Sequence, residues 1–155
     1  MITYHINEPK TLDSQEILSF LRETDELITP RLSVLVVLED YAKKITDKAV
    51  MFTARDDDKI IGLSAIYFNK APEYSFSTYM MVKREYQQVG MVGIELSSLV
   101  KKYIKDNDSA GLRFEIRKSN TPLLKYNLKR GAKIISENKY PGTNEVSVLM
   151  ELTYK

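Results

Sequence analysis

The sequence has no cysteine, no tryptophan, a single histidine and only six glycines among its 155 residues. Without cysteine, the chain has no disulfide framework, no thiolate metal site and no cysteine nucleophile. The one imidazole belongs to His5, in the alternating stretch MITYHI, which we interpret as a first β-strand. We therefore expect no metal cofactor and no serine–histidine catalysis.

Long apolar runs and a strong charge imbalance are also missing. No segment reaches 18 consecutive apolar residues and none reads as an apolar signal segment, so we expect a soluble cytoplasmic protein with no membrane partner. Lys and Arg number 23 against 21 Asp and Glu, a net charge of +2 that is too weak to indicate a nucleic-acid partner.

Length and composition suit one folded unit. With 43% hydrophobic residues, 155 residues can build one continuous core, and we predict a single domain over residues 1–155. Patterning predicts seven strands, in residues 1–6, 49–55, 60–68, 73–82, 112–117, 132–136 and 145–152. Helices are expected over residues 12–24 with Ser14 as a cap, 38–45, from about 88 to 103, and from about 120 to Gly131. This order predicts a mixed α/β fold of the α+β type, with a mostly antiparallel central sheet of about six to seven strands flanked by about four helices.

Two glycines stand where the third of these helices should begin. Gly90 and Gly93 lie between the strand that ends at Val82 and a helical pattern that continues to Tyr103. A glycine inside a helix costs roughly 1 kcal/mol relative to alanine, so the pair needs a reason. One reason is close packing of the helix on the sheet; the other is the approach of a phosphate group to the helix N-terminus. The pattern alone leaves both open.

A basic stretch follows in the C-terminal part of the chain. Between residues 113 and 133 the only acid is Glu115, against seven basic residues: Arg113, Arg117, Lys118, Lys125, Lys129, Arg130 and Lys133. Either a solvated basic face or a site for an anionic ligand explains this bias.

The glycine segment carries a family resemblance. The run V-K-R-E-Y-Q-Q-V-G-M-V-G, residues 82–93, resembles motif A of the GNAT superfamily of acyl-CoA-dependent N-acetyltransferases, commonly V-x-P-x-Y-R/Q-x-x-G-x-G/A. Residues 120–132, N-T-P-L-L-K-Y-N-L-K-R-G-A, are similar to the family's second element on the coenzyme side, N-x-x-A-x-x-x-Y-x-x-x-G-F. A weaker likeness in residues 30–45 is to bacterial members that we associate with amino-sugar or polysaccharide gene contexts.

The resemblance implies a coenzyme site. Backbone groups of Met81 and Val82 would hold the pantetheine arm of acetyl-CoA, and Asn120 would contact the pantetheine or cap its own helix. The pyrophosphate would lie on the backbone N–H groups of a turn made of Gln87, Gln88, Val89, Gly90, Met91, Val92 and Gly93.

The sequence departs from the family pattern where a catalytic tyrosine is common. Seven residues after Asn120 this chain has Asn127, with Tyr126 beside it, so either side chain, or water, is left as the group that stabilises the departing thiolate. As general base, Glu73, Tyr79 and Glu115 lie on or beside the central strands, although each also suits a structural role.

The resemblance therefore predicts an N-acetyltransferase that moves an acetyl group from acetyl-CoA to a primary amine of a small molecule, with an amino sugar as one candidate. Residues 22–48 are expected to select the acceptor. A non-catalytic acyl-CoA-binding module is the main alternative, and a small nucleic-acid-binding α/β domain is ranked last. The oligomeric state stays open, with a homodimer as one expectation.

Overall fold

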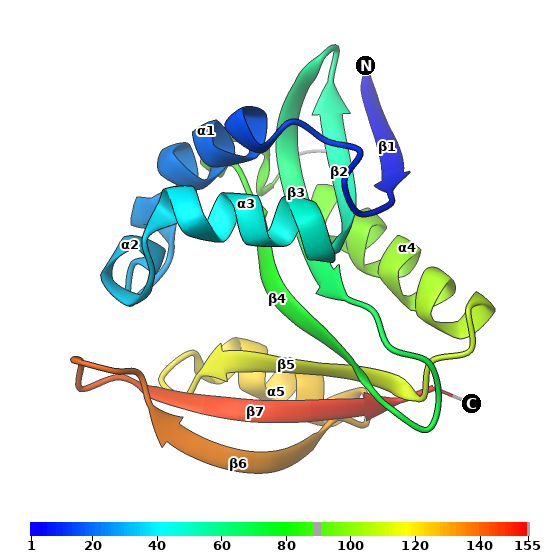
Figure 1. Cartoon of the computed structure of the whole chain (residues 1–155). Coiled ribbons are helices and arrows are strands. Elements are labelled where there is room, and N and C mark those ends of the chain that lie inside the picture. The colour runs from blue at the N-terminus through cyan, green and yellow to red at the C-terminus, as the bar shows by residue number, and fades with distance from the viewer. Residues whose placement is uncertain (89–90, 155) are drawn as a thin grey trace.

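The computed structural model describes residues 1–88 and 91–154, and its chain forms one seven-stranded sheet with helices on both faces (Figure 1). The strands are β1 (Ile2–Asn7), β2 (Val50–Asp56), β3 (Lys59–Tyr67), β4 (Ser75–Val82), β5 (Gly111–Arg117), β6 (Lys133–Lys139) and β7 (Val146–Thr153). The helices are α1 (Ser14–Thr24), α2 (Leu32–Leu35), α3 (Leu38–Lys48), α4 (Val92–Asp106) and α5 (Thr121–Lys129), with 3₁₀ turns η1 (Asp25–Leu27) and η2 (Arg84–Tyr86).

The strand order is β1-β2-β3-β4-β5-β7-β6, and every neighbouring pair is antiparallel except β4 and β5. The predicted mixed α/β class and mostly antiparallel sheet are confirmed. The parallel pair follows from the crossover through α4, which returns the chain to the same end of the sheet.

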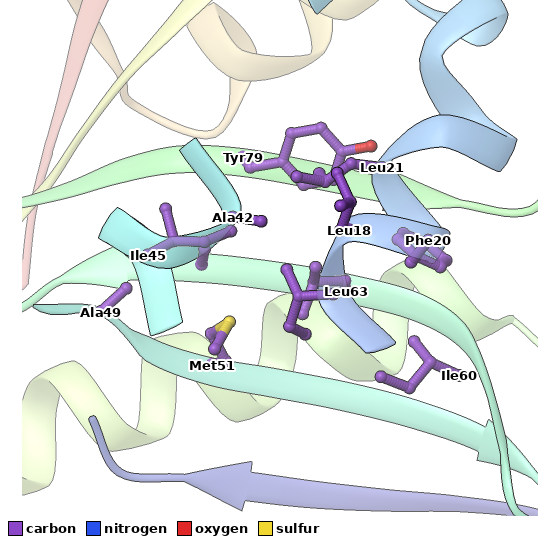
Figure 2. Packing of buried hydrophobic residues seen from close by; sticks show 12 residues of the cluster. Leu18, Phe20, Leu21, Ala42, Ile45, Ala49, Met51, Ile60, Leu63 and Tyr79 are labelled. Atoms are coloured by element: carbon purple, nitrogen blue, oxygen red, sulfur yellow. The ribbon is translucent and has the colours of Figure 1, made fainter. Parts of the chain in front are cut away.

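Two apolar layers hold the central strands. Figure 2 shows the first, in which Leu18, Leu21 and Ile45 of α1 and α3 pack onto Met51 and Leu63 of β2 and β3. On the opposite face α4 covers the same strands, and β2 and β3 are therefore buried on both faces. A smaller cluster lies under α5 on the β5–β7 part of the sheet.

Helix boundaries follow the expected capping chemistry with small shifts. Asp13, one residue before the predicted cap Ser14, accepts a hydrogen bond from the Gln15 N–H (2.9 Å) and caps α1. Asn120 caps α5 through the Leu123 N–H (3.4 Å). The helix predicted from about residue 88 begins at Val92, because η2 occupies the preceding link. The short α2 was not predicted.

None of the helices in the described ranges is long and apolar enough to cross a membrane. Within the same ranges, no group of three or more His, Asp and Glu side chains is arranged to hold a metal ion.

Candidate functional site

The parallel strands β4 and β5 are paired over only part of their length. Their register joins Ser75 to Leu112, Phe76 to Arg113 and Ser77 to Phe114, and then stops. At the same point β4 carries an extra residue, since Ala65 of β3 pairs with Tyr79 whereas Ile66 pairs with Ser77. Thr78 is this β-bulge, and a bulge bends its strand. Beyond it the two strands diverge, as Figure 1 shows, and we call residues 78–82 and 115–117 the splay.

Side chains from α3 fix the bulge. The Tyr41 hydroxyl donates to the carbonyl oxygen of Thr78 (3.0 Å) and lies 2.6 Å from its Oγ1 atom. Burial raises the pKa of the Tyr41 phenol, so it stays protonated and remains a donor at neutral pH. Sequence reasoning missed both residues, because a bulge depends on the partner strand and leaves no local pattern.

Register also decides which backbone groups of β4 face the splay. The Lys83 N–H donates to the Ile61 carbonyl of β3 (2.8 Å), so by the two-residue period of a strand the backbone groups of Met81 also point to β3. Those of Met80 and Val82 point the other way, toward β5. The resemblance names Met81 and Val82 for the pantetheine arm; by this register Val82 faces the splay, and Met80 does so in place of Met81.

Beyond β4, η2 and residues 87–88 lead toward α4. The Gln87 side chain donates to the Val82 carbonyl (3.0 Å), and the Tyr86 hydroxyl donates to Asp56 (2.6 Å), which lowers the pKa of that carboxyl. Gln88 is exposed, and Met91 has a left-handed backbone with φ of 54°. Val89 and Gly90, which the resemblance also assigns to this turn, lie outside the described residues.

The N-terminus of α4 presents backbone donors that the helix itself does not use. Its first backbone bond runs from the Glu95 N–H to the Met91 carbonyl (3.0 Å), so the N–H groups of Val92, Gly93 and Ile94 have no acceptor within the helix. Met91, at the cap position, supplies no side-chain hydrogen bond. Such a terminus, with the positive end of the helix dipole, favours an anion.

Close packing of a helix on the sheet, one of the two reasons considered for Gly90 and Gly93, instead explains Gly62. A Cβ on Gly62 of β3 would lie 3.0 Å from Leu96 and 3.1 Å from Val92, so α4 approaches the sheet closely there. A Cβ on Gly93 would meet only Met80 (3.9 Å) and Val82 (4.0 Å), which are ordinary contacts. Gly93 is therefore not required by helix–sheet packing, whereas Val92 is a core residue.

Two of the predicted general bases are poorly placed to act on a ligand in the splay. Glu73 lies outside it, and Tyr79 is buried. Glu73 precedes β4, at the paired end, where its backbone bonds to Lys70 and Ala110. Tyr79 is only 5% exposed and points under α1, as Figure 2 shows; its hydroxyl is 2.6 Å from that of Thr24. Burial raises the pKa of this phenol, which makes it a poor base near neutral pH. Neither side chain therefore lies beside Glu115, the third predicted base: Glu73 is outside the splay, and the Tyr79 side chain is buried under α1.

On α5, the two candidates for the departing thiolate differ sharply. Tyr126 is 59% exposed and its ring packs against the Arg130 guanidinium at 5.3 Å. Asn127 is 2% exposed; its amide donates to the Leu123 carbonyl (3.0 Å) and accepts from Arg130 Nε (2.8 Å). Asn127 therefore holds the C-terminal part of α5 together, and only Tyr126 presents a hydroxyl to solvent.

Charged residues also lie on the face of the sheet that carries α1; sequence reasoning had singled out Glu115 and Arg117, but not Lys83 and Glu23. The nearly buried Lys83 pairs with Glu23 of α1, and this hydrogen bond lowers the pKa of the Glu23 carboxyl. Glu115 and Arg117 lie on the part of β5 that is no longer paired with β4, and Ser147 donates a hydrogen bond to Glu115. In the sequence, Lys83 directly after the apolar strand was the one indication of this ion pair.

Solved structures share this fold. An acetyltransferase of the GNAT family from Streptococcus pneumoniae superposes with a TM-score of 0.68 at 16% identity, over 100% of both chains. An N-acetyltransferase from Staphylococcus aureus gives 0.73 at 15% identity, over 99% of this chain and 97% of that one. A GNAT family acetyltransferase from Elizabethkingia anophelis, with acetyl-CoA bound, gives 0.68 at 20% identity, over 99% and 98%.

The chain has the GNAT fold. The resemblance found in the sequence is thus confirmed for the architecture. Neither family models nor curated protein sequences match the chain. In this GNAT fold β4 leads from the bulge at Thr78 into η2, and α4 begins at Val92.

Proposed function

We propose that the protein is an acetyl-CoA-dependent N-acetyltransferase acting on a primary amine of a small molecule. The observation that carries this proposal is the bulge at Thr78, which separates β4 from β5 and directs the strand toward the uncapped N-terminus of α4. The Elizabethkingia structure, which contains acetyl-CoA, supports a coenzyme on the same fold. An amino sugar is the first acceptor class to test.

The residues present fit the coenzyme. The N–H groups of Val92, Gly93 and Ile94, which have no acceptor within the helix, suit the pyrophosphate, and among the described residues nothing crowds a Cβ on Gly93. Backbone groups of Met80 and Val82 that face the splay can pair with the amides of the pantetheine arm, except that the Val82 carbonyl already accepts from Gln87. When bound, acetyl-CoA supplies an acetyl thioester whose thiolate leaves readily.

The chain's own groups then have three tasks. The Met80 N–H can donate to the acetyl carbonyl oxygen where negative charge develops. Glu115, on the open arm of the splay, can take a proton from the incoming ammonium directly or through water. Tyr126 can donate to the departing sulfur. Alignment of the two reactants supplies much of the rate, since orientation alone is worth roughly 7–11 kcal/mol in favourable cases.

The decisive experiment compares acetyl-CoA binding in the wild type and Gly93→Asp. Aspartate suits the first turn of a helix, so the variant should fold, yet its carboxylate would occupy the phosphate position and repel it. We expect acetyl-CoA to raise the melting temperature of the wild type and to lose at least about tenfold in affinity in the variant. Ser97→Asp adds the same charge one turn further along α4, at an exposed position, and should bind almost normally.

Thiol release with a panel of amines then tests catalysis. Turnover of a primary amine, lost in Gly93→Asp, supports the transferase. Coenzyme binding without turnover of any amine would favour the non-catalytic acyl-CoA-binding module instead. The nucleic-acid reading has less support, because two residues of the basic stretch are paired: Arg113 with Glu151 (2.8 Å) and Lys118 with Glu137 (2.7 Å).

A further inference from the structure

Arg117 is the last residue of β5, and its guanidinium has N–H groups without an acceptor among the described residues. One of its terminal nitrogens donates to the Thr29 carbonyl (3.4 Å), in the segment between η1 and α2. Its Nε atom is buried and has no hydrogen-bond partner in the part of the chain that the structure describes. A guanidinium carries five N–H donors in a planar fork, and among the described residues only one donor of Arg117 has an acceptor.

The strand period places Arg117 on the acceptor side of the sheet. Leu112 and Ile116 of β5 belong to the apolar clusters under α4 and α5, so Arg113, Glu115 and Arg117 project from the other face, the one that carries α1 and α3. The contact with Thr29 confirms this direction for Arg117. Its neighbour in the row, Glu115, stands about 6.6 Å away along the strand.

Arg113 provides an internal comparison on the same face. Its Nε and one terminal nitrogen both bond to Glu151 at 2.8 Å, and its guanidinium also packs on the Tyr74 ring. Arg113 lies where β4 and β5 are still paired, and its guanidinium already has a carboxylate. Arg117 lies where the strands have separated and has no such partner among the described residues.

We propose that Arg117 binds a carboxylate on the acceptor, so that the substrate is an amine that also carries a carboxylate. The inference rests on the proposed acetyltransferase function. A guanidinium fork matches a carboxylate in a bidentate fashion. A phosphate dianion fits less well, because Glu115 in the same row would repel it. The same Glu115 would attract the substrate's ammonium group, giving the two ends of the acceptor opposite partners.

The test uses a matched pair of probes, γ-aminobutyrate and its primary amide, which differ in the negative charge. Ligand-observed NMR measures their binding to the CoA-saturated protein. We expect the wild type to bind the acid at least about tenfold more tightly than the amide, because a charge-assisted bidentate contact is lost in the amide. Arg117→Gln should remove that preference, whereas Arg113→Gln should keep it.

Several results would overturn the inference. They are equal affinity of the wild type for both probes, no binding of either probe, or an unchanged preference in Arg117→Gln. If Arg117 only anchored the segment at Thr29, its substitution would weaken both probes equally. Because the readout is binding, a protein that binds the acid through Arg117 but releases no thiol from acetyl-CoA would contradict the transferase proposal and leave the carboxylate site standing.

Discussion

Tyr126 and Asn127 show how neighbouring residues on one helix can have unrelated roles. A step of one residue turns the side chain by about 100° around the helix axis, which carries Asn127 inward and Tyr126 outward. The family resemblance assigned the departing thiolate to either residue, and the sequence pattern could not choose between them. The hydrogen bonds of Asn127 to Leu123 and Arg130 occupy its amide, so the exposed phenol is the better donor.

Tyr126→Phe should lower kcat by about 10² if the phenol protonates or hydrogen-bonds the departing thiolate, because only the transition state loses a partner. Acetyl-CoA affinity should stay unchanged. Steady-state kinetics and calorimetric titration of acetyl-CoA measure the two effects. A kcat within about threefold of the wild type would remove Tyr126 from the catalytic residues and leave positioning as the main source of rate.

The matched control is Asn127→Ala on the same helix. It removes the buried Asn127 amide and its hydrogen bonds to Leu123 and Arg130, so we expect a loss of roughly 1–2 kcal/mol in the free energy of unfolding. Below the melting temperature, kcat should change little. A large loss of kcat with unaltered stability would reverse the order of the two residues.

At the scale of elements, local signals predicted most strands and helices but not the features that build the site. Apolar alternation and caps such as Asn120 are encoded in neighbouring residues, so β2 to β5 and α4 to α5 lie close to their predicted ranges. The bulge at Thr78 arises from a mismatch between two strands, and α2 is four residues long. Neither leaves a periodic pattern. The choice of Met80 over Met81 needed the register for the same reason.

Asp25 connects the two ends of the segment from η1 to α2 through hydrogen bonds. Its carboxylate accepts from the Ser33 backbone N–H (2.9 Å) and from the Ser33 hydroxyl (2.5 Å). Since Arg117 reaches the same segment at Thr29, this segment would border the acceptor in the proposed site. This gives a structural basis for the prediction that residues 22–48 select the amine.

Asp25→Ala should therefore raise the KM for the amine by about tenfold while the KM for acetyl-CoA stays within about twofold. The physical reason is that in the proposed site the coenzyme would contact the N-terminus of α4, on the opposite face of the sheet from α1 and α3. Kinetics with each substrate varied in turn provide the measurement. Lys102→Ala, which breaks an exposed pair with Asp106 on α4, serves as a control outside that segment and should change neither constant by more than about twofold. Parallel increases in both KM values would contradict the division of the site.

Across the whole molecule, the sheet consists of two parts joined at β4 and β5. Three residue pairs and a buried hydrogen bond between the Ser75 and Ser109 hydroxyls (2.9 Å) connect them. The short junction lets the strands part beyond Thr78. The sequence could not predict it, because β4 and β5 are separated by all of α4 and the pairing is non-local. The family resemblance, and not periodicity, supplied the expectation that a coenzyme lies there.

Gly111, the first residue of β5, is what allows this junction to close against β7. It has φ of 158°, and a Cβ there would lie 2.0 Å from the Leu152 carbonyl oxygen and 2.9 Å from the Tyr74 ring. Backbone cannot yield as a flexible side chain does, so Gly111→Ala must push β5 away from β7 or from β4. We expect a loss of roughly 3 kcal/mol or more in the free energy of unfolding, measured by urea denaturation.

A second glycine separates this steric effect from the cost of backbone conformation. Gly142 also has a positive φ, of 71°, but a Cβ there would meet nothing within 4 Å. Gly142→Ala should therefore cost only about 1 kcal/mol, the usual penalty for an L side chain in a left-handed conformation. If both variants lost equal stability, conformation alone would explain Gly111. A larger loss at Gly111, accompanied by weaker acetyl-CoA binding, would show that the β5–β7 contact also maintains the splay.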